Sequence, residues 1–361
     1  MAGDARAAGY RQLSDIEHVR ERCGMYAGSD KPERSAQWVG HVSSDGLRVE
    51  RREIEFVPAM RKLFCEVLDN ATDAAGRDDT VRTIKAFAEE NRVGMYNDGA
   101  GIPVVQHDSG VLVPELVFGN LRAGQNFDDD VRTGAGMNGI GVKLCSIFST
   151  EFTARTLDAA AGKLWTGVWT GGMNKYDGGK VKDKKAATGY VDIMFRPEAR
   201  FLPPSGQVSD DLTALLAYRV MEAALTTPPR VRLWFNGVKL PDLTLAKFAK
   251  LHSGDDSIVA SDETADSPWR VVVAKTFEPL VVAFVNGLRS GGKHVDAIEK
   301  ALYTALIDAA KSKRDLKGVD LKPALLKRHV ALFITANLNA PTFDSQTKAG
   351  GCRPPYPPLD W

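Results

Sequence analysis

The sequence predicts an α+β protein built from two domains, on three observations. The chain has 361 residues, which is enough for two hydrophobic cores of ordinary size. Patterns typical of helices and patterns typical of strands occur together in both halves of the chain. A polar stretch rich in small residues, 251–269, lies between the halves and places a domain boundary near Asp256.

The individual elements follow from hydrophobic periodicity and from turn residues. In 61–76 apolar residues recur at helical spacing, and 92–103 has the pattern of a short strand that breaks into a glycine turn. Strand-like runs in 151–197 alternate with glycine and lysine turns, as in an antiparallel meander, and 180–185 is predicted to be a plain turn. The other predicted elements are a helix at 211–225, a hairpin with an Asn-Gly turn at 231–241, a helix at 295–311 and a strand at 330–338.

Composition narrows the class of protein and its compartment. Apolar residues make up 43% of the chain and charged residues 26%, as in soluble globular proteins. The formal net charge is +1, so any contact with DNA must come from a local patch. Four cysteines without a CxxC pair indicate neither a zinc site nor a disulfide framework, and a reducing intracellular setting fits them best. No apolar run reaches the length of a membrane span, so no membrane partner is expected.

The predicted helix 61–76 carries three polar residues on one face. Glu66, Asn70 and Asp73 stand at positions i, i+4 and i+7. A carboxylate and an amide beside an apolar face are suited to general-base activation of a water and to oxygen ligation of Mg²⁺. An ordinary amphipathic helix with a polar stripe explains the same pattern, and for this helix taken alone it is the favoured explanation.

A glycine turn follows the predicted strand near residue 98. In NDGAGIP the glycines let the backbone approach a flat ligand closely, and Asp98 can accept a hydrogen bond from an exocyclic amine. An ordinary Asn-Asp-Gly turn is the alternative.

A glycine-rich loop precedes a further helical pattern. Gly134, Gly136, Gly139 and Gly141 come directly before an apolar run of helical spacing. The N-terminus of such a helix offers free N–H groups and a positive dipole end to an anion, and Lys143 adds a mobile positive charge for phosphate oxygens. The chain contains no GxxxxGK(S/T), and the acidic run NFDDDVR before the loop disfavours a dinucleotide site. A flexible loop without a ligand is the alternative.

The order of these motifs resembles the ATPase region of type IIA DNA topoisomerases of the eukaryotic and large-virus kind. These enzymes belong to the wider GHKL group, which includes gyrase, histidine kinases, mismatch-repair clamps and heat-shock chaperones. The resemblance runs almost end to end through a strap (YRQLSDIEHVRERCGMYAGS), a helix and adenine motif (EVLDNATD, NDGAGIPV) and an ATP lid (VPELVFGNLRAGQNFDDD, GMNGIGVKLCSIFST). Two transducer motifs, FVNGLRSGGKHVD and PTFDSQTK, distinguish topoisomerases from the other members.

The resemblance implies a fold and a domain division. The fold is a Bergerat (GHKL) α/β sandwich, with a mixed sheet covered by helices, followed by an α+β transducer domain. The division is a strap at 1–35 that is exchanged between subunits, an ATPase domain at 36–256 and a transducer at 257–361 that is truncated at its C-terminal end. The implied activity is ATP binding and hydrolysis that drives homodimerisation and captures a double-stranded DNA segment for strand passage.

The resemblance also implies the residues of the site. Glu66 is the base that polarises the attacking water, Asn70 is the Mg²⁺ ligand and Asp98 reads the adenine amine. Gln346 and Lys348 reach from the transducer to the γ-phosphate as further catalytic residues. The other residues implied to bind ATP are Asp73, Gly101, Ile102, Asn126, Thr133, Gly136, Asn138, Gly139, Ile140, Gly141 and Lys143, with Tyr10 acting on the nucleotide of the other subunit.

The chain departs from the family pattern at a few positions. Met137 stands where the lid usually has arginine, and Gly124 and Gln125 replace common serines. The threonine expected to help read adenine has three candidate positions, Thr188, Tyr190 and Val191.

A basic stretch at 311–329 holds seven Lys or Arg against two Asp. Such a stretch is usually a solvated surface, but in a transducer it could contact DNA phosphates without reading bases. The candidate DNA-binding residues are Lys311, Lys313, Arg314, Lys317, Lys327 and Arg328.

The sequence contains no acidic cleavage motif of the EGDSA type and nothing that resembles a winged-helix tyrosine region. DNA cleavage is therefore expected in another domain or subunit of the same enzyme, and the chain is expected to be a fragment or a separate ATPase subunit. Two alternative functions remain, an ATP-dependent clamp of the mismatch-repair kind and a nucleotide-binding dimerisation module without turnover.

Overall fold

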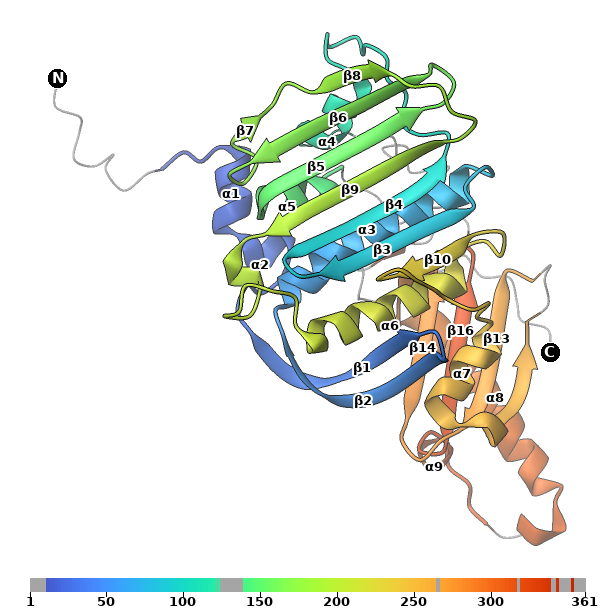
Figure 1. The fold of residues 1–361 in the computed structure, drawn as a ribbon. Helices are drawn as coiled ribbons and strands as arrows, with labels where there is room; N and C mark the ends of the chain where they lie inside the picture. The colour runs from blue at the N-terminus through green and yellow to red at the C-terminus, as the bar shows by residue number, and fades with distance from the viewer. Residues whose placement is uncertain are drawn as a thin grey trace.

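The computed structural model describes residues 11–121, 123, 139–263, 267–316 and 319–338, together with the backbone of 342–343 and 352–353. These residues form two large sheets, one of nine strands and one of five. The nine-stranded sheet fills the upper part of Figure 1 and the five-stranded sheet lies at the lower right, each with helices packed against it. The predicted α+β class is confirmed.

The nine-stranded sheet has the order β11-β10-β3-β4-β9-β5-β6-β7, and β8 also pairs with β6. Its neighbouring strands are antiparallel except for β10 and β3, which are parallel, so the sheet is mixed as expected. The strands are β3 (Thr83–Glu89), β4 (Arg92–Gly99), β5 (Ser149–Asp158), β6 (Lys163–Thr170), β7 (Lys175–Tyr176), β8 (Lys180–Asp183), β9 (Gly189–Pro197), β10 (Arg232–Phe235) and β11 (Val238–Lys239).

Two sequence predictions for this sheet are corrected by the structure. The region 151–197 is not a simple meander, because β9 inserts between β4 and β5 instead of following β8. The segment 180–185 is not a plain turn, because β8 pairs with β6. All four residues of β8 are exposed, and a charged edge strand of this kind lacks the apolar alternation by which strands are recognised. The hairpin at 231–241 is confirmed, and Asn236 and Gly237 both take positive φ as its turn requires.

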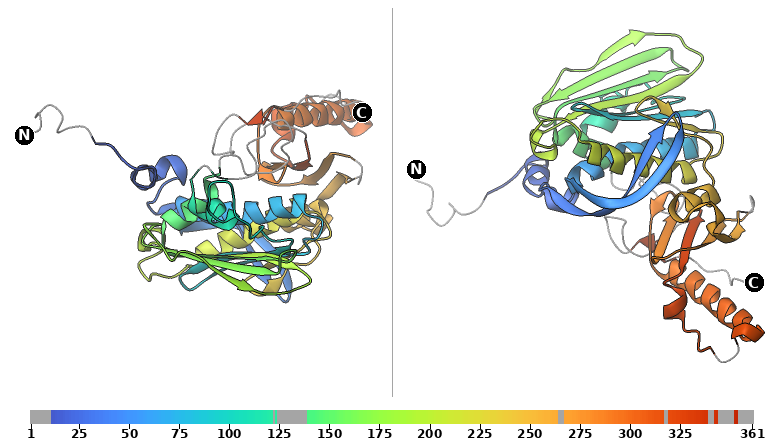
Figure 2. Two further views of the ribbon diagram at one scale, coloured as in Figure 1. Left: turned by 90° about the horizontal axis from the view of Figure 1, so that it is seen from above. Right: turned by 60° about the horizontal axis from the view of Figure 1, so that its bottom comes forward.

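Helices α3 (Pro58–Arg77), α5 (Gly141–Ile147) and α6 (Asp210–Thr226) lie on one face of this sheet, as the view from above in Figure 2 shows. The helices predicted at 61–76 and 211–225 are confirmed, and each extends by a few residues. Pro58 stands in the first turn of α3, where its missing N–H is not needed, and Ser209 caps α6 by accepting from the backbone N–H of Leu212. The apolar side of α3 is fully buried in the main core.

A long hairpin of β1 (Glu33–Ser43) and β2 (Gly46–Phe56) curves around α6 in Figure 1. Val39 and Ile54 pack in a small core with Leu215. At Gly40 an added Cβ would lie 2.9 Å from the backbone N of Tyr218, so only glycine allows this approach. This hairpin is not among the elements predicted from the sequence, because charged residues crowd β2 and mask its alternation.

Three short helices complete this part of the chain. They are α1 (Asp15–Glu21), α2 (Cys23–Tyr26) and α4 (Val113–Gly119). Ser14 and Glu17 form a capping box at the start of α1, and Arg20 pairs with Glu198 at 2.7 Å. The described part of the strap is therefore fastened to its own chain.

The five-stranded sheet has the order β12-β13-β16-β14-β15 and carries α7 and α8. The predicted helix 295–311 and strand 330–338 are observed as α8 and β16. The elements are α7 (Leu245–Ser253), β12 (Ile258–Asp262), β13 (Trp269–Lys275), β14 (Leu280–Val285), β15 (Leu288–Arg289), α8 (Lys293–Lys311), α9 (Pro323–Leu326), β16 (Val330–Ala336), β17 (Thr342–Phe343) and β18 (Cys352–Arg353). The sheet begins close to Asp256, and the division into independent domains stays a prediction.

An aromatic cluster joins the β1–β2 hairpin and α6 to the five-stranded sheet across α7. The ring of His252 lies 4.6 Å from the rings of Trp38 and Phe248 and 5.3 Å from that of Phe333. Its Nε2 is 3.0 Å from the hydroxyl of Tyr218 on α6. The hairpin, α6, α7 and β16 therefore share one packed contact. No helix among the described residues is long and apolar enough to cross a lipid bilayer.

Candidate functional site

The polar residues of α3 lie together as predicted. Glu66 and Asn70 are half-buried on one face of the helix, and Asp73 is buried. The amine of Lys62, one turn before Glu66, forms an ion pair with the Glu66 carboxylate. Burial alone would lower the pKa of Lys62, but the Glu66 carboxylate together with Cys65 and Asp69 outweighs it and raises that pKa. Glu66 is thus a partly buried carboxylate held by a neighbouring cation.

The first residue of α5 lies directly against the Glu66 carboxylate. A Cβ added at Gly141 would be 1.8 Å from Glu66 Oε2, so the close approach requires a residue without a side chain. The two helices are packed further along, where the Cys145 thiol contacts the carbonyl oxygen of Leu63 at 3.2 Å. The packing therefore brings the N-terminal end of α5, the positive end of its dipole, to the Glu66 carboxylate.

Lys143 lies in a different place from the one that the sequence predicts. Its amine is buried and donates to the carbonyl oxygens of Ala123, at 2.6 Å, and Gly139, at 2.7 Å. Burial lowers the pKa of Lys143 to about 8. Gly139 has a φ of 58°, and an added Cβ there would be 2.6 Å from the same Ala123 oxygen. In this arrangement the lysine binds the backbone on both sides of the glycine loop instead of facing solvent.

The NDGAGIP turn is held by side chains from other elements. Asp78 accepts from the N–H of Ala100 at 2.8 Å, and Thr156 accepts from the N–H of Ile102 at 2.7 Å. Gly101 has a φ of 80°, and an added Cβ would lie 2.1 Å from the carbonyl oxygen of Leu157. Gly101 is therefore required by its approach to β5.

Asn97 and Asp98 occupy opposite faces of β4. Asn97 shares the helix-facing side with the buried Val93 and Met95, because side chains alternate along a strand. Oδ1 of Asp98 accepts from the backbone N–H groups of Arg82, at 2.7 Å, and of Thr83. The structure thus ties Asp98 to the start of β3 and does not bring it to Glu66 and Asn70. Sequence reasoning missed Asn97, although Asn97 alternates along the strand with the apolar residues Val93 and Met95 and so could have been placed on their face of the sheet.

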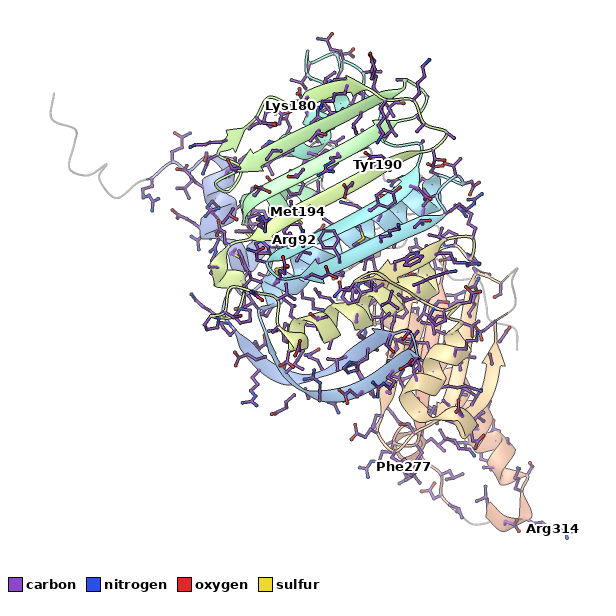
Figure 3. The ribbon with its side chains drawn as sticks, viewed as in Figure 1. Arg92, Lys180, Tyr190, Met194, Phe277 and Arg314 are labelled. Atoms are coloured by element: carbon purple, nitrogen blue, oxygen red, sulfur yellow. The ribbon has the colours of Figure 1, made fainter. Side chains whose placement is uncertain are left out.

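The register of β9 shows on which face of the sheet the candidates Tyr190 and Val191 for the adenine-reading position lie. Val191 is opposite Asn97 and also opposite Thr156, so the three side chains form a row on the helix-facing side. Tyr190 is opposite Asp98 on the other face, where its ring lies 5.6 Å from that of Tyr96. Figure 3 shows Tyr190 on the face of the sheet turned away from α3. Of the three candidate positions, Val191 is the one beside Asn97.

Several predicted site residues lie outside the described part of the chain. They are Tyr10, Gly124, Gln125, Asn126, Thr133, Gly134, Gly136, Met137, Asn138, Lys317, Gln346 and Lys348. Their roles stay predictions. Ile102 and Ile140 are described, and both pack against the main core.

Part of the basic stretch is neutralised within the chain. Lys327 pairs with Glu299 on α8 at 3.0 Å, and Lys311 pairs with Asp308 at 2.8 Å. Lys313, Arg314 and Arg328 are exposed. These three side chains are the better candidates for contact with phosphate.

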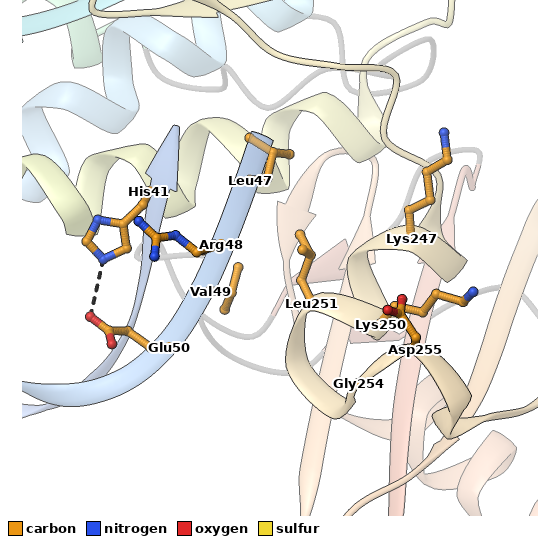
Figure 4. Close-up of a pocket in the computed structure, with 10 residues that line it drawn as sticks. All are labelled: His41, Leu47, Arg48, Val49, Glu50, Lys247, Lys250, Leu251, Gly254 and Asp255. Atoms are coloured by element: carbon orange, nitrogen blue, oxygen red, sulfur yellow. Dashed lines mark hydrogen bonds and ion pairs between the residues drawn. The ribbon is translucent and has the colours of Figure 1, made fainter. Parts of the chain in front are cut away.

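A hollow of about 730 Å³ lies away from this site, between β2 and α7 (Figure 4). Arg48, Lys247 and Lys250 stand around it, and His41 contacts Glu50 across the hairpin at 3.2 Å. Glu66 and Asn70 do not line it, and it is therefore no part of the candidate site.

Comparisons with known proteins find similarity to DNA gyrase B and to DNA topoisomerase II. Residues 244–350 match the family model described as DNA gyrase B. The chain is 33% identical over 359 residues to DNA topoisomerase 2 of Penicillium chrysogenum, covering 94% of this chain and 22% of that protein. It is 31% identical to the solved ATPase and transducer domains of DNA topoisomerase II from Balamuthia mandrillaris, with a TM-score of 0.84 over 94% of this chain and 88% of that one.

A second solved structure, the ATPase region of Saccharomyces cerevisiae topoisomerase II, superposes with a TM-score of 0.83 at 27% identity, over 94% of this chain and 89% of that one. The chain spans about a fifth of the length of the curated relative that it matches. The likeness extends over both sheets, because it covers nearly all of this chain.

Proposed function

We propose that the chain binds magnesium-ATP between α3 and α5 and hydrolyses it, because it belongs to the family of the ATPase and transducer regions of DNA topoisomerase II. The observation that carries the proposal is the contact of the Glu66 carboxylate with the first residue of α5. A base and an anion-binding helix end meet there, as transfer of a phosphoryl group to water requires.

The proposed position of ATP follows from the two ends of the site. The adenine lies towards Asn97 and Val191, where an amide and an apolar side chain stand next to each other. The triphosphate lies towards the glycine loop and the start of α5, where backbone N–H groups can bind its oxygens. Lys143 would reach the phosphates only by leaving the carbonyl oxygens of Ala123 and Gly139.

The residues present fit a magnesium ion. Asn70 offers an amide oxygen one helical turn from Glu66, and Mg²⁺ prefers oxygen ligands and usually takes the others from substrate phosphates and water. The ion would neutralise charge on the phosphates.

Glu66 has the chemistry of the proposed general base. A carboxylate orients a water for attack and takes its proton, and the ion pair with Lys62 fixes where that carboxylate points. Gln346 and Lys348 are proposed to reach the γ-phosphate from the five-stranded sheet, so that bound ATP ties the two parts of the molecule together.

In the complete enzyme we infer the wider role of the family. ATP binding would close two copies of this region, with Tyr10 of each strap contacting the other copy's nucleotide, around a DNA segment. The proposed domains are the strap at 1–35, the ATPase domain at 36–256 and the transducer at 257–361, and the nucleus or cytoplasm is the proposed compartment. DNA cleavage is proposed to lie in another part of the enzyme. Similarity to topoisomerases over 94% of the chain favours this role over a mismatch-repair clamp.

The direct test is the variant Glu66→Gln, which keeps the size of the side chain and removes its basicity. We expect ATP turnover to fall by about two to three orders of magnitude, while affinity for a non-hydrolysable ATP analogue changes less than about threefold. Glu89→Gln, at the exposed end of β3, is the matched control and should hydrolyse ATP like the wild type. Wild-type turnover in Glu66→Gln would refute the assignment of the base.

A further inference from the structure

A line of four charged side chains connects the five-stranded sheet with α3. We call it the charge chain, and its members in spatial order are Arg289 on β15, Glu222 and Arg219 on α6, and Asp69 on α3. Asp69 directly precedes Asn70, so the chain ends beside the proposed magnesium ligand. Two of its links are close ion pairs and one is not.

The first close link fixes α3 to α6. Arg219 donates to Oδ1 of Asp69 at 2.6 Å, and their side chains are only 9% and 17% exposed. Burial alone would lower the pKa of Arg219, but Asp69 and its other neighbours outweigh it and raise that pKa. A guanidinium buried to this degree needs its carboxylate, because an unpaired charge in the interior is strongly unfavourable. The position of Arg219 therefore constrains the position of α3 at Asp69.

The second close link reaches the other sheet. Arg289 donates to Oε1 of Glu222 at 2.9 Å, and the Glu222 side chain is 1% exposed. Arg289 lies in β15, which pairs with β14 of the five-stranded sheet. A displacement of this sheet relative to α6 must therefore either carry Glu222 with it or break a pair to a buried carboxylate.

The middle link is open. Nη1 of Arg219 lies 4.0 Å from Oε2 of Glu222, and it has no hydrogen-bond partner among the described residues although it is buried. A hydrogen bond between these atoms needs about 2.9 Å, so a shift of about 1 Å would close the link. Buried donors are nearly always satisfied. The charge chain therefore has a second arrangement available, with all its links made, that differs from the present one by a small movement of α6 side chains.

The geometry points to the charge chain as the connection through which the five-stranded sheet positions α3, and with it Glu66 and Asn70. Arg289, Glu222 and Arg219 are positioning residues in this account. The inference rests on the proposed hydrolysis at Glu66, and it names how that site is regulated from the second sheet. The exposed pair Arg51–Glu278 also joins the two parts, but it ends on the hairpin and such pairs contribute little.

The test compares Arg289→Met, which removes the guanidinium and keeps the aliphatic stem, with Arg289→Lys and with the matched control Arg270→Met on β13. In Arg289→Met we expect kcat for ATP to fall about tenfold with the apparent KM changed less than about twofold. Arg289→Lys should recover to within about threefold of wild type, and Arg270→Met should equal wild type. An unchanged kcat in Arg289→Met overturns the proposal.

Hydrogen exchange of the α3 amides without nucleotide gives a readout that does not depend on turnover. Arg289→Met should speed the exchange of 66–73 by about fivefold, and Arg270→Met should not. If the wild-type chain fails to hydrolyse ATP, the proposed function fails, and the exchange measurement then tests the charge chain alone, with unchanged exchange overturning it.

Combining Arg289→Met with Glu222→Gln should add no further loss of kcat, because both substitutions remove the same ion pair, whereas additive losses contradict the charge chain.

Discussion

Asn97 and Asp98 are adjacent in β4 but have different roles, because successive side chains of a strand point to opposite faces of the sheet. Asn97 lies on the helix-facing side beside Val191, and Asp98 binds the backbone of Arg82 and Thr83 on the other side. An amide both donates and accepts hydrogen bonds, which suits the edge of an adenine ring. The carboxylate of Asp98 satisfies two backbone donors and has a structural role here.

Two substitutions separate these tasks. Asn97→Ala should raise the Kd for a non-hydrolysable ATP analogue about tenfold, because it removes a hydrogen-bonding group from the adenine end. Asp98→Ala should leave that Kd within about twofold and lower the free energy of unfolding by about 2 kcal/mol, because two backbone N–H groups lose their acceptor. Titration calorimetry and urea unfolding measure the two quantities. A loss of affinity in Asp98→Ala with none in Asn97→Ala would contradict the assignment.

For single residues, the sequence predicts which side chains share one face of a helix. It does not predict hydrogen-bond partners that come from distant segments of the chain. Glu66, Asn70 and Asp73 follow from spacing alone, since helical geometry determines which residues share a face. The carboxylate of Asp98 in a glycine turn predicts a contact with adenine, but its backbone partners lie 15 and 16 residues earlier in the chain. The position of Lys143 in the first turn of a helix predicts a contact with phosphate, but its acceptor Ala123 is 20 residues away.

At the scale of elements, α7 is the helix that connects the β1–β2 hairpin and α6 with the five-stranded sheet. His252 near its end packs against Trp38 of the hairpin and Phe333 of β16. The carbonyl oxygen of Phe248 can only accept, so His252 donates to it through Nδ1. Burial lowers the pKa of His252 to about 4, so the ring is neutral at pH 7 and its Nε2 accepts from the Tyr218 hydroxyl.

This contact predicts a loss of stability in mild acid. Between the ordinary pKa of 6.5 and the folded value of about 4, the unfolded chain binds a proton on His252 and the folded chain does not. The free energy of unfolding should therefore fall by about 2 kcal/mol between pH 7 and pH 5 on account of this residue. Urea unfolding of wild type and His252→Gln at both pH values isolates the contribution. An equal pH dependence in the two proteins would show that His252 is not buried in its neutral form.

Strong periodicity decides which elements the sequence predicts. Helices α3, α6 and α8 carry sustained apolar spacing and were predicted to within a few residues of their ends. The β1–β2 hairpin and β8 were missed because their exposed, charged residues lack the alternation of a half-buried strand. Both lie against structure supplied by other segments, α6 for the hairpin and β6 for β8.

At the scale of the whole molecule, strand order and the joining of the two sheets could not be read from periodicity. The pattern of β9 marks it as a strand but does not select β4 and β5 as its neighbours. The family resemblance supplied the architecture that local patterns do not encode. The aromatic cluster around His252 and the charge chain from Arg289 to Asp69 then show how the second sheet is held against the helices of the first.

Binding of a magnesium nucleotide between α3 and the start of α5 can be measured by titration calorimetry with a non-hydrolysable ATP analogue. We predict saturable binding of one nucleotide per chain in millimolar magnesium, and a loss of affinity of at least about tenfold when the ion is removed with EDTA. An absence of binding heat at millimolar analogue and magnesium, across several temperatures, would contradict the account.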